Sequence, residues 1–203
     1  MLTNYMVYYH ISNMVCQYAF TLAWYKPACP QEKSRDAAML TLDPEISLAL
    51  ENLAATGGTL PALPRGDWKS RRQLLNTTYS GMTLPETIAE VDVKEFAIDA
   101  PDGNQIDLRL YRVNGTSPTA ALVYTHGGGK IALDLDNYDP ICRYYAAKAG
   151  VAVLAIGFRM APEYPFPTPV EDCYTGLVWL SEHAHKLGIN PQAIGIAGDS
   201  GGG

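Results

Sequence analysis

Apolar and polar side chains alternate in two neighbouring stretches, EVDVKEFAID at 90–99 and QIDLRLYRV at 105–113. A period of two residues is typical of β-strands that bury one face. Between the stretches lies Pro101-Asp102-Gly103-Asn104, and glycine and asparagine tolerate the positive φ of a tight turn. The pattern therefore predicts an antiparallel strand pair joined by a hairpin turn.

Three later stretches are continuously apolar, as strands of a parallel sheet are when both faces are covered. They are TAALVYTH at 119–126, VAVLAIGF at 151–158 and AIGIAG at 193–198. Helical stretches separate them, one at about 138–149 and one from about Val170 to Leu187. Alternating strands and helices favour right-handed βαβ crossovers. The fold class predicted is α/β, with the antiparallel pair leading into a parallel sheet.

Two more helices are predicted before the strand pair. In LDPEISLALENLAATGG, Asp43 is suited to the N-cap, Pro44 to the first turn and Gly57 to the end of the helix. Residues 67–80 are also predicted to be helical. We assign residues 41–203 to one domain and residues 1–40 to an N-terminal extension of uncertain structure.

The first 25 residues contain no Asp, Glu, Lys or Arg and are rich in tyrosine. Polar residues such as His10 and Gln17 interrupt the run, and a membrane anchor needs about 20 predominantly apolar residues. A secretory signal would begin with a basic region, whereas the first basic residue here is Lys26. The segment does not favour a membrane protein, and we expect a cytoplasmic one.

Composition narrows the class of protein. The 203 residues are 47% hydrophobic and 18% charged, with a net charge of −6, which indicates a soluble globular chain and argues against a nucleic-acid partner. Cysteines at 16, 29, 142 and 173 show no C-x-x-C spacing. We therefore expect free thiols, with neither a zinc site nor a disulfide framework. Nothing in the sequence indicates an oligomeric state.

Two motifs follow predicted parallel strands, where open α/β sheets place their sites. The first is His126-Gly127-Gly128-Gly129, and the second is Gly198-Asp199-Ser200-Gly201-Gly202, which fits G-x-S-x-G. The second motif is typical of a sharp turn that presents a nucleophilic serine. When a serine attacks an ester, backbone N–H groups must stabilise the oxyanion, and glycines allow the main chain to approach closely enough.

The chain from about residue 43 resembles the N-terminal part of the hormone-sensitive-lipase-like family of α/β-hydrolases, the fold-3 type carboxylesterases. The resemblance rests on HGGG, FRMAPEYPFPTPVEDC, GDSGGG and the capped helix followed by the hairpin. It implies a carboxylesterase that acts on small-molecule esters with short to medium acyl chains. It also implies that no cofactor and no metal are needed.

The resemblance makes Ser200 the catalytic nucleophile. It makes Gly128, Gly129 and Gly201 the oxyanion-hole donors, with Gly127 shaping the loop. Three further positions match family positions that look structural, and we expect polar ties there rather than acid–base groups: Arg159, Glu163 and Asp172.

Other candidate residues are not expected in the reaction. In this fold the histidine of the triad follows the serine along the chain, so His126 is not expected to be the base. Asp199 adjoins the serine and is not expected in the triad either. His183 and His185 lie at the end of a predicted helix, and we expect them to be solvated. Lys130 departs from the family, which usually has a bulky apolar or aromatic residue there, and this leaves the acyl preference open.

The sequence ends three residues after Ser200. The expected fold is thus an α/β-hydrolase fold truncated after the nucleophile elbow, without a downstream Asp and His. We expect these 203 residues to be inactive by themselves. Two alternatives stay open: a receptor-like module that binds small molecules on the same fold, as plant gibberellin receptors do, and a non-functional remnant.

Overall fold

The structure is a computed structural model. It describes residues 42–55, 63–81, 83 and 88–203. The chain falls into two compact units, Met1–Ala62 and Leu63–Gly203. The division into an extension at 1–40 and a domain at 41–203 stays a prediction, because the extension lies outside the described residues.

The described element of the first unit is helix α2, Pro44–Ala55. It begins where the sequence predicts, since the Asp43 carboxylate accepts a hydrogen bond from the Glu45 N–H at 2.8 Å. A short acceptor at this position satisfies one of the N–H groups that a helix leaves unpaired at its start. The predicted end at Gly57 lies outside the described residues.

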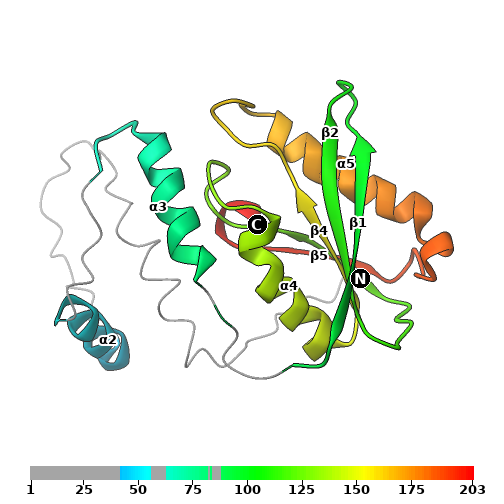
Figure 1. Cartoon of the computed structure of the whole chain (residues 1–203), viewed down its shortest axis with the longest axis horizontal. Coiled ribbons are helices and arrows are strands. Elements are labelled where there is room, and N and C mark those ends of the chain that lie inside the picture. The colour runs from blue at the N-terminus through cyan, green and yellow to red at the C-terminus, as the bar shows by residue number, and fades with distance from the viewer. Residues whose placement is uncertain (1–41, 56–62, 82, 84–87) are drawn as a thin grey trace, which may run out of the picture. The chain divides into compact units, whose positions relative to one another are not determined.

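The described part of the second unit holds one mixed sheet of five strands, in the spatial order β1-β2-β4-β3-β5 (Figure 1). The strands are β1 Val91–Asp99, β2 Gln105–Val113, β3 Ala121–Thr125, β4 Ala152–Gly157 and β5 Ile194–Gly198. β1 pairs with β2 and β2 with β4 in antiparallel fashion, whereas β3 runs parallel to both β4 and β5. The predicted hairpin and parallel strands are confirmed.

Helices α4, Leu135–Ala149, and α5, Thr168–His183, cover opposite faces of the sheet (Figure 1). Alternate residues of the central strands enter two separate hydrophobic clusters, so Leu154 packs with Leu180 of α5 and Val153 with Tyr138 of α4. Residues 152–156 of β4 are all buried. Continuous apolar runs are therefore explained by burial on both faces.

The helix boundaries differ in part from the prediction. α4 begins three residues earlier than 138, because the Asp134 carboxylate accepts hydrogen bonds from the N–H groups of Asp136 and Asn137. α5 ends at His183, and a short 3₁₀ helix, η1 His185–Leu187, continues it to Gly188, which is left-handed. Helix α3, Trp68–Ser80, occupies nearly the whole of the predicted stretch.

The last predicted strand is covered on fewer sides than its sequence indicates. β5 lies at one edge of the described sheet, and Ile196 is 65% exposed. Cys142 is buried and Cys173 half-buried, and both are free thiols as expected, while Cys16 and Cys29 lie outside the described residues. No helix in the part of the chain that the structure describes has the length and hydropathy to cross a bilayer.

A buried ion pair joins α5 to the segment that follows β4. The Asp172 carboxylate is fully buried and accepts hydrogen bonds from the backbone N–H and Nε of Arg159 at 2.9 Å and from its Nη2 at 2.6 Å. Arg159 also contacts Asp102 in the β1–β2 turn at 2.6 Å. These carboxylates raise the pKa of Arg159. The predicted structural roles of Arg159 and Asp172 agree with these contacts.

We predict that Asp172→Asn lowers the free energy of unfolding by about 3 kcal/mol, because breaking a buried pair leaves the guanidinium without its buried counter-charge. Urea unfolding followed by circular dichroism measures the change. Asp102→Asn, which removes the exposed partner of the same arginine, is the matched control and should have a smaller effect. Equal effects of the two substitutions would contradict the assignment.

Candidate active site

The G-x-S-x-G motif forms a strained turn at the end of β5. Ser200 has a φ of +48°, a left-handed conformation that residues with a side chain rarely adopt. It opens a short 3₁₀ helix, Ser200–Gly202, and its side chain is exposed. The Asp199 N–H donates to the Thr125 carbonyl at 3.2 Å and so holds the turn against the end of β3. Such backbone strain is common at functional sites.

The glycines of the turn are required by space. A Cβ at Gly198 would overlap the Gly202 carbonyl oxygen and the Thr125 hydroxyl, and one at Gly202 would overlap the Thr125 carbonyl oxygen. Gly195, in the same strand, is different because a Cβ there would meet Leu122 at an ordinary 3.5 Å. The turn can therefore pack against β3 only without side chains at 198 and 202.

We predict that Gly198→Ala destabilises the chain by about 1–3 kcal/mol, the usual effect of overpacking. It should also increase amide hydrogen exchange in the turn at 198–202, which we call the elbow. Gly195→Ala is the matched control and should leave both quantities nearly unchanged. Urea unfolding and hydrogen–deuterium exchange measure them. If the two variants behave alike, close packing of the turn on β3 is wrong.

The glycine loop after β3 also adopts conformations that favour glycine. Gly128 and Gly129 have φ values of +103° and +63°, and Lys130 follows at +61°. A Cβ at Gly128 would overlap the carbonyl of Ala132, whose N–H donates back to the Gly128 carbonyl at 3.1 Å. The loop thus folds tightly on itself and leaves its backbone open toward β5.

The glycine loop and the elbow touch. A Cβ at Gly201 would lie 2.7 Å from the Gly129 Cα and 2.8 Å from the Gly129 nitrogen, so the two backbones are in direct contact. The contact follows from the sheet, because Thr125 and Gly198 are partners at the ends of neighbouring parallel strands. The structure brings the five predicted site residues to one edge of the sheet: Ser200, Gly127, Gly128, Gly129 and Gly201.

His126 is packed inside the protein. It is 3% exposed, and its ring stacks on Phe158 with 4.1 Å between centroids. Its Nδ1 lies 2.8 Å from the Gly127 carbonyl oxygen, and since a carbonyl only accepts, this nitrogen carries the proton. Burial lowers the pKa of His126. A buried histidine that stacks on Phe158 and contacts the glycine loop agrees with the prediction that His126 is not the base.

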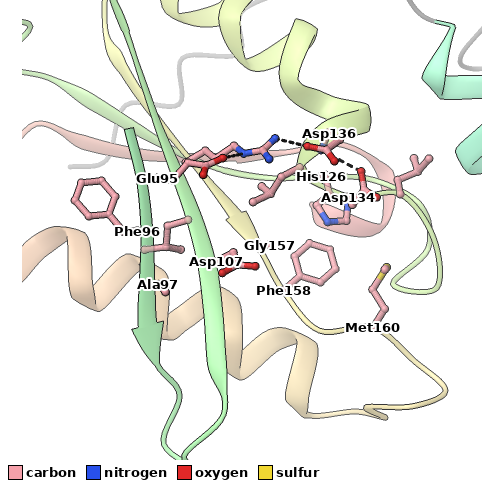
Figure 2. Close-up of a pocket in the computed structure, with 14 residues that line it drawn as sticks. Glu95, Phe96, Ala97, Asp107, His126, Asp134, Asp136, Gly157, Phe158 and Met160 are labelled. Atoms are coloured by element: carbon pink, nitrogen blue, oxygen red, sulfur yellow. Dashed lines mark hydrogen bonds and ion pairs between the residues drawn. The ribbon is translucent and has the colours of Figure 1, made fainter. Parts of the chain in front are cut away.

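A groove of about 560 Å³ adjoins His126 between the β1–β2 pair and the start of α4 (Figure 2). Asp134 and Asp136 line one side of it, and Phe158 and Met160 another. Its charges are largely paired, since Arg109 bonds both Glu95 and Asp136 at 2.9 and 2.7 Å. Ser200 and the four candidate site glycines are not among its lining residues. No group of three or more potential metal ligands occurs among the described residues.

Arg72 of α3 ties two loops together. Its guanidinium donates to the carbonyl oxygens of Ile131 at 2.5 Å and Ala161 at 2.9 Å and forms a two-pronged pair with Glu163 at 2.7 and 2.8 Å. The prediction of a structural tie at Glu163 agrees with this pair, whereas the sequence analysis did not identify Arg72. The hydrogen bond with Arg72 holds the pKa of Glu163 at about 2, below its ordinary 4.5.

Because its pKa is lowered on folding, Glu163 contributes stability above pH 4.5 that is lost as the pH falls toward 2. We predict that Glu163→Gln makes the unfolding free energy less dependent on pH in this window. Urea unfolding at several pH values measures the slope. An unchanged slope would show that the pair with Arg72 does not form.

Two other histidines lie within the described residues, and His10 lies outside them. His183 is half-buried rather than solvated, because its ring stacks on Trp179 at 4.7 Å and its Nδ1 lies 2.9 Å from the Trp179 carbonyl oxygen. His185 is exposed in η1, as expected.

Comparisons with known proteins bear on the fold and on the class of the relatives. Residues 122–203 match a family described as having the alpha/beta hydrolase fold. The carboxylic ester hydrolase LipN of Mycobacterium tuberculosis is 38% identical over 80% of this chain and 43% of its own length. Brefeldin A esterase, a bacterial homologue of human hormone-sensitive lipase, superposes with a TM-score of 0.64 and 31% identity over 75% of this chain and 47% of its own.

The chain has the α/β-hydrolase fold. A third relative is the ethyl acetate hydrolase of Pseudomonas putida. It is 34% identical over 81% of this chain and 53% of its own length. The relatives are named as carboxylic ester hydrolases and esterases, so the α/β-hydrolase is related to that enzyme class. It spans about half the length of the curated relatives.

Proposed function

We propose that this α/β-hydrolase provides the nucleophile and the oxyanion hole of a serine carboxylesterase. The observation that carries the proposal is the contact between the two loops: the left-handed Ser200 stands beside a backbone pair, Gly129 and Gly201, whose approach a side chain would block. A nucleophile next to preorganised N–H donors is the arrangement that acyl transfer requires.

In the proposed reaction the Ser200 Oγ attacks the ester carbonyl carbon and gives its proton to a general base. The carbonyl oxygen becomes an anion that accepts hydrogen bonds from the N–H groups of Gly128, Gly129 and Gly201. The C–O bond to the alcohol then breaks, and the base returns the proton to the leaving oxygen. Water attacks the resulting acyl-enzyme by the same route and releases the acid and Ser200.

A base is needed because a serine hydroxyl is a weak nucleophile. No histidine follows Ser200 within these 203 residues, and His126 is buried with its ring stacked on Phe158. We propose that the triad is completed by an Asp and a His outside this sequence and that residues 1–203 alone do not sustain turnover.

We propose small esters with short to medium acyl chains as substrates and no metal or cofactor. The named substrate of the ethyl acetate hydrolase supports short acyl groups by analogy. Lys130 follows the glycine loop with its Nζ 4.5 Å from the centre of the Phe158 ring. A cation near the loop favours short or polar acyl groups over long chains, because a long chain would have to displace its hydration.

The test uses a fusion in which Gly203 is continued by the matching C-terminal part of the Pseudomonas putida enzyme, so that the missing strands and the Asp and His are present. We predict that Ser200→Ala lowers kcat for p-nitrophenyl butyrate by about 10⁶-fold and abolishes labelling by a fluorophosphonate probe. Ser181→Ala, an exposed serine on α5, is the matched control. EDTA should change nothing.

Full activity of the Ser200→Ala fusion would refute the assignment of the nucleophile. Tight binding of an ester-like ligand by the unmodified fusion, without any turnover, would favour the binding module over the esterase.

A further inference from the structure

Asp199 lies near a group of tyrosines, since a Cβ at Gly127 would be within 4 Å of both the Asp199 Cβ and the Tyr138 hydroxyl. The cluster consists of Tyr79 of α3, Tyr124 of β3 and Tyr138 of α4, and we call it the tyrosine cluster. Tyr138 is its centre, since its ring centroid lies 6.0 Å from those of both Tyr79 and Tyr124. Besides burial, the charge of Asp199 raises the pKa of all three hydroxyl groups. Three elements of the fold therefore meet in the tyrosine cluster.

Two members of the tyrosine cluster are buried, and the hydroxyl of one of them lacks a hydrogen-bond partner. Tyr124 is 2% exposed and Tyr138 3%. The Tyr124 hydroxyl has no partner at ordinary hydrogen-bond geometry among the described residues, although buried hydroxyl groups nearly always find one. Asp199 raises the pKa of Tyr124 both by its charge and as an acceptor of the hydroxyl proton. We take the Asp199 carboxylate as the acceptor of the Tyr124 hydroxyl proton.

Asp199 and the tyrosine cluster touch the glycine loop as well as the elbow. A Cβ at Gly127 would lie 2.7 Å from the Tyr138 hydroxyl, 3.3 Å from the Asp199 carbonyl oxygen and 3.7 Å from the Asp199 Cβ. On the elbow side, the Asp199 carbonyl accepts from the Gly202 N–H at 2.7 Å. One residue therefore contacts the first glycine of one loop and the last glycine of the other.

We propose that Asp199 is a positioning residue that, together with Tyr124 and Tyr138, holds the glycine loop and the elbow at a fixed separation. The separation matters because an oxyanion hole acts through donors that are already in place when charge develops. If the loops drift apart, the N–H groups of Gly129 and Gly201 no longer point at one position. This inference rests on the proposed function, and it leaves Asp199 outside the triad, as the sequence predicts.

The first experiment needs no activity and uses the 203-residue chain. Asp199→Ala should increase amide hydrogen exchange about tenfold, the loss expected for one hydrogen bond to a charged group, in both segments 126–133 and 198–203. The hairpin at 91–113 should not change. Tyr124→Phe keeps the ring and should act in the same direction but less strongly. Asp92→Ala and Tyr174→Phe, both exposed, are the matched controls.

The coupling between loops is what distinguishes this inference from a general structural role. If Asp199→Ala changes exchange only in its own segment, or equally throughout the chain, the inference is wrong. If Tyr124→Phe leaves segment 126–133 unchanged, the tyrosine cluster has no part in it.

The second experiment measures the rate in the fusion. Asp199→Ala should lower kcat about 10²-fold with KM nearly unchanged, because misplaced donors weaken the transition state rather than substrate binding. Asp199→Asn, whose amide oxygen still accepts one hydroxyl proton, should recover most of the loss. A rise in KM at constant kcat would overturn the inference.

The Ser200→Ala fusion separates the two proposals. If that variant is inactive while Asp199→Ala is as fast as the unmodified fusion, the positioning inference fails alone. If Ser200→Ala is fully active, the proposed function fails, and the exchange experiment still decides whether Asp199 couples the loops.

Discussion

Parallel pairing of β3 with β5 is the constraint from which the candidate site follows. The register sets Thr125 opposite Gly198, so the glycine loop and the elbow leave the sheet side by side at its carboxyl edge. Parallel strands in an α/β sheet end at the same edge, and their following loops meet there. Every contact described between Gly201 and Gly129, or between Asp199 and Thr125, depends on that one alignment.

Two arginines link the elements around the paired strands β3 and β5. Arg159 joins α5 to the segment after β4 through the buried Asp172. Arg72 joins α3 to the loops that follow β3 and β4. Each satisfies backbone or carboxylate oxygens that would otherwise lack a partner, which is where such contacts contribute most. These arginine contacts hold the segments that follow β3 and β4. The strained Ser200 turn is thus supported by parts of the chain that do not touch it.

The local patterns were sufficient for the strands, their directions and the two motifs. Alternation identified β1 and β2, and continuous apolar runs identified the parallel strands, because both signals depend on neighbouring residues. The start of α4 was predicted three residues too late. Proline is best tolerated in the first turn of a helix, so Pro140 favours a start near 138, whereas the Asp134 cap starts the helix at Leu135. Arg72 and the tyrosine cluster could not be found, because their partners are distant in sequence and meet only in the folded chain.

The pairing of β3 with β5 also has a consequence for the order of folding. β4 lies next to β3 on the other side, and the chain passes through α4, β4 and α5 before it reaches β5. Closing so long a loop costs conformational entropy. This cost is offset only when the intervening units have packed. During synthesis the elbow leaves the ribosome last among these elements, so the sheet that receives it can already be in place. The elbow is then added to strands that have already packed, and slow folding of α5 or β4 would delay the formation of the candidate site.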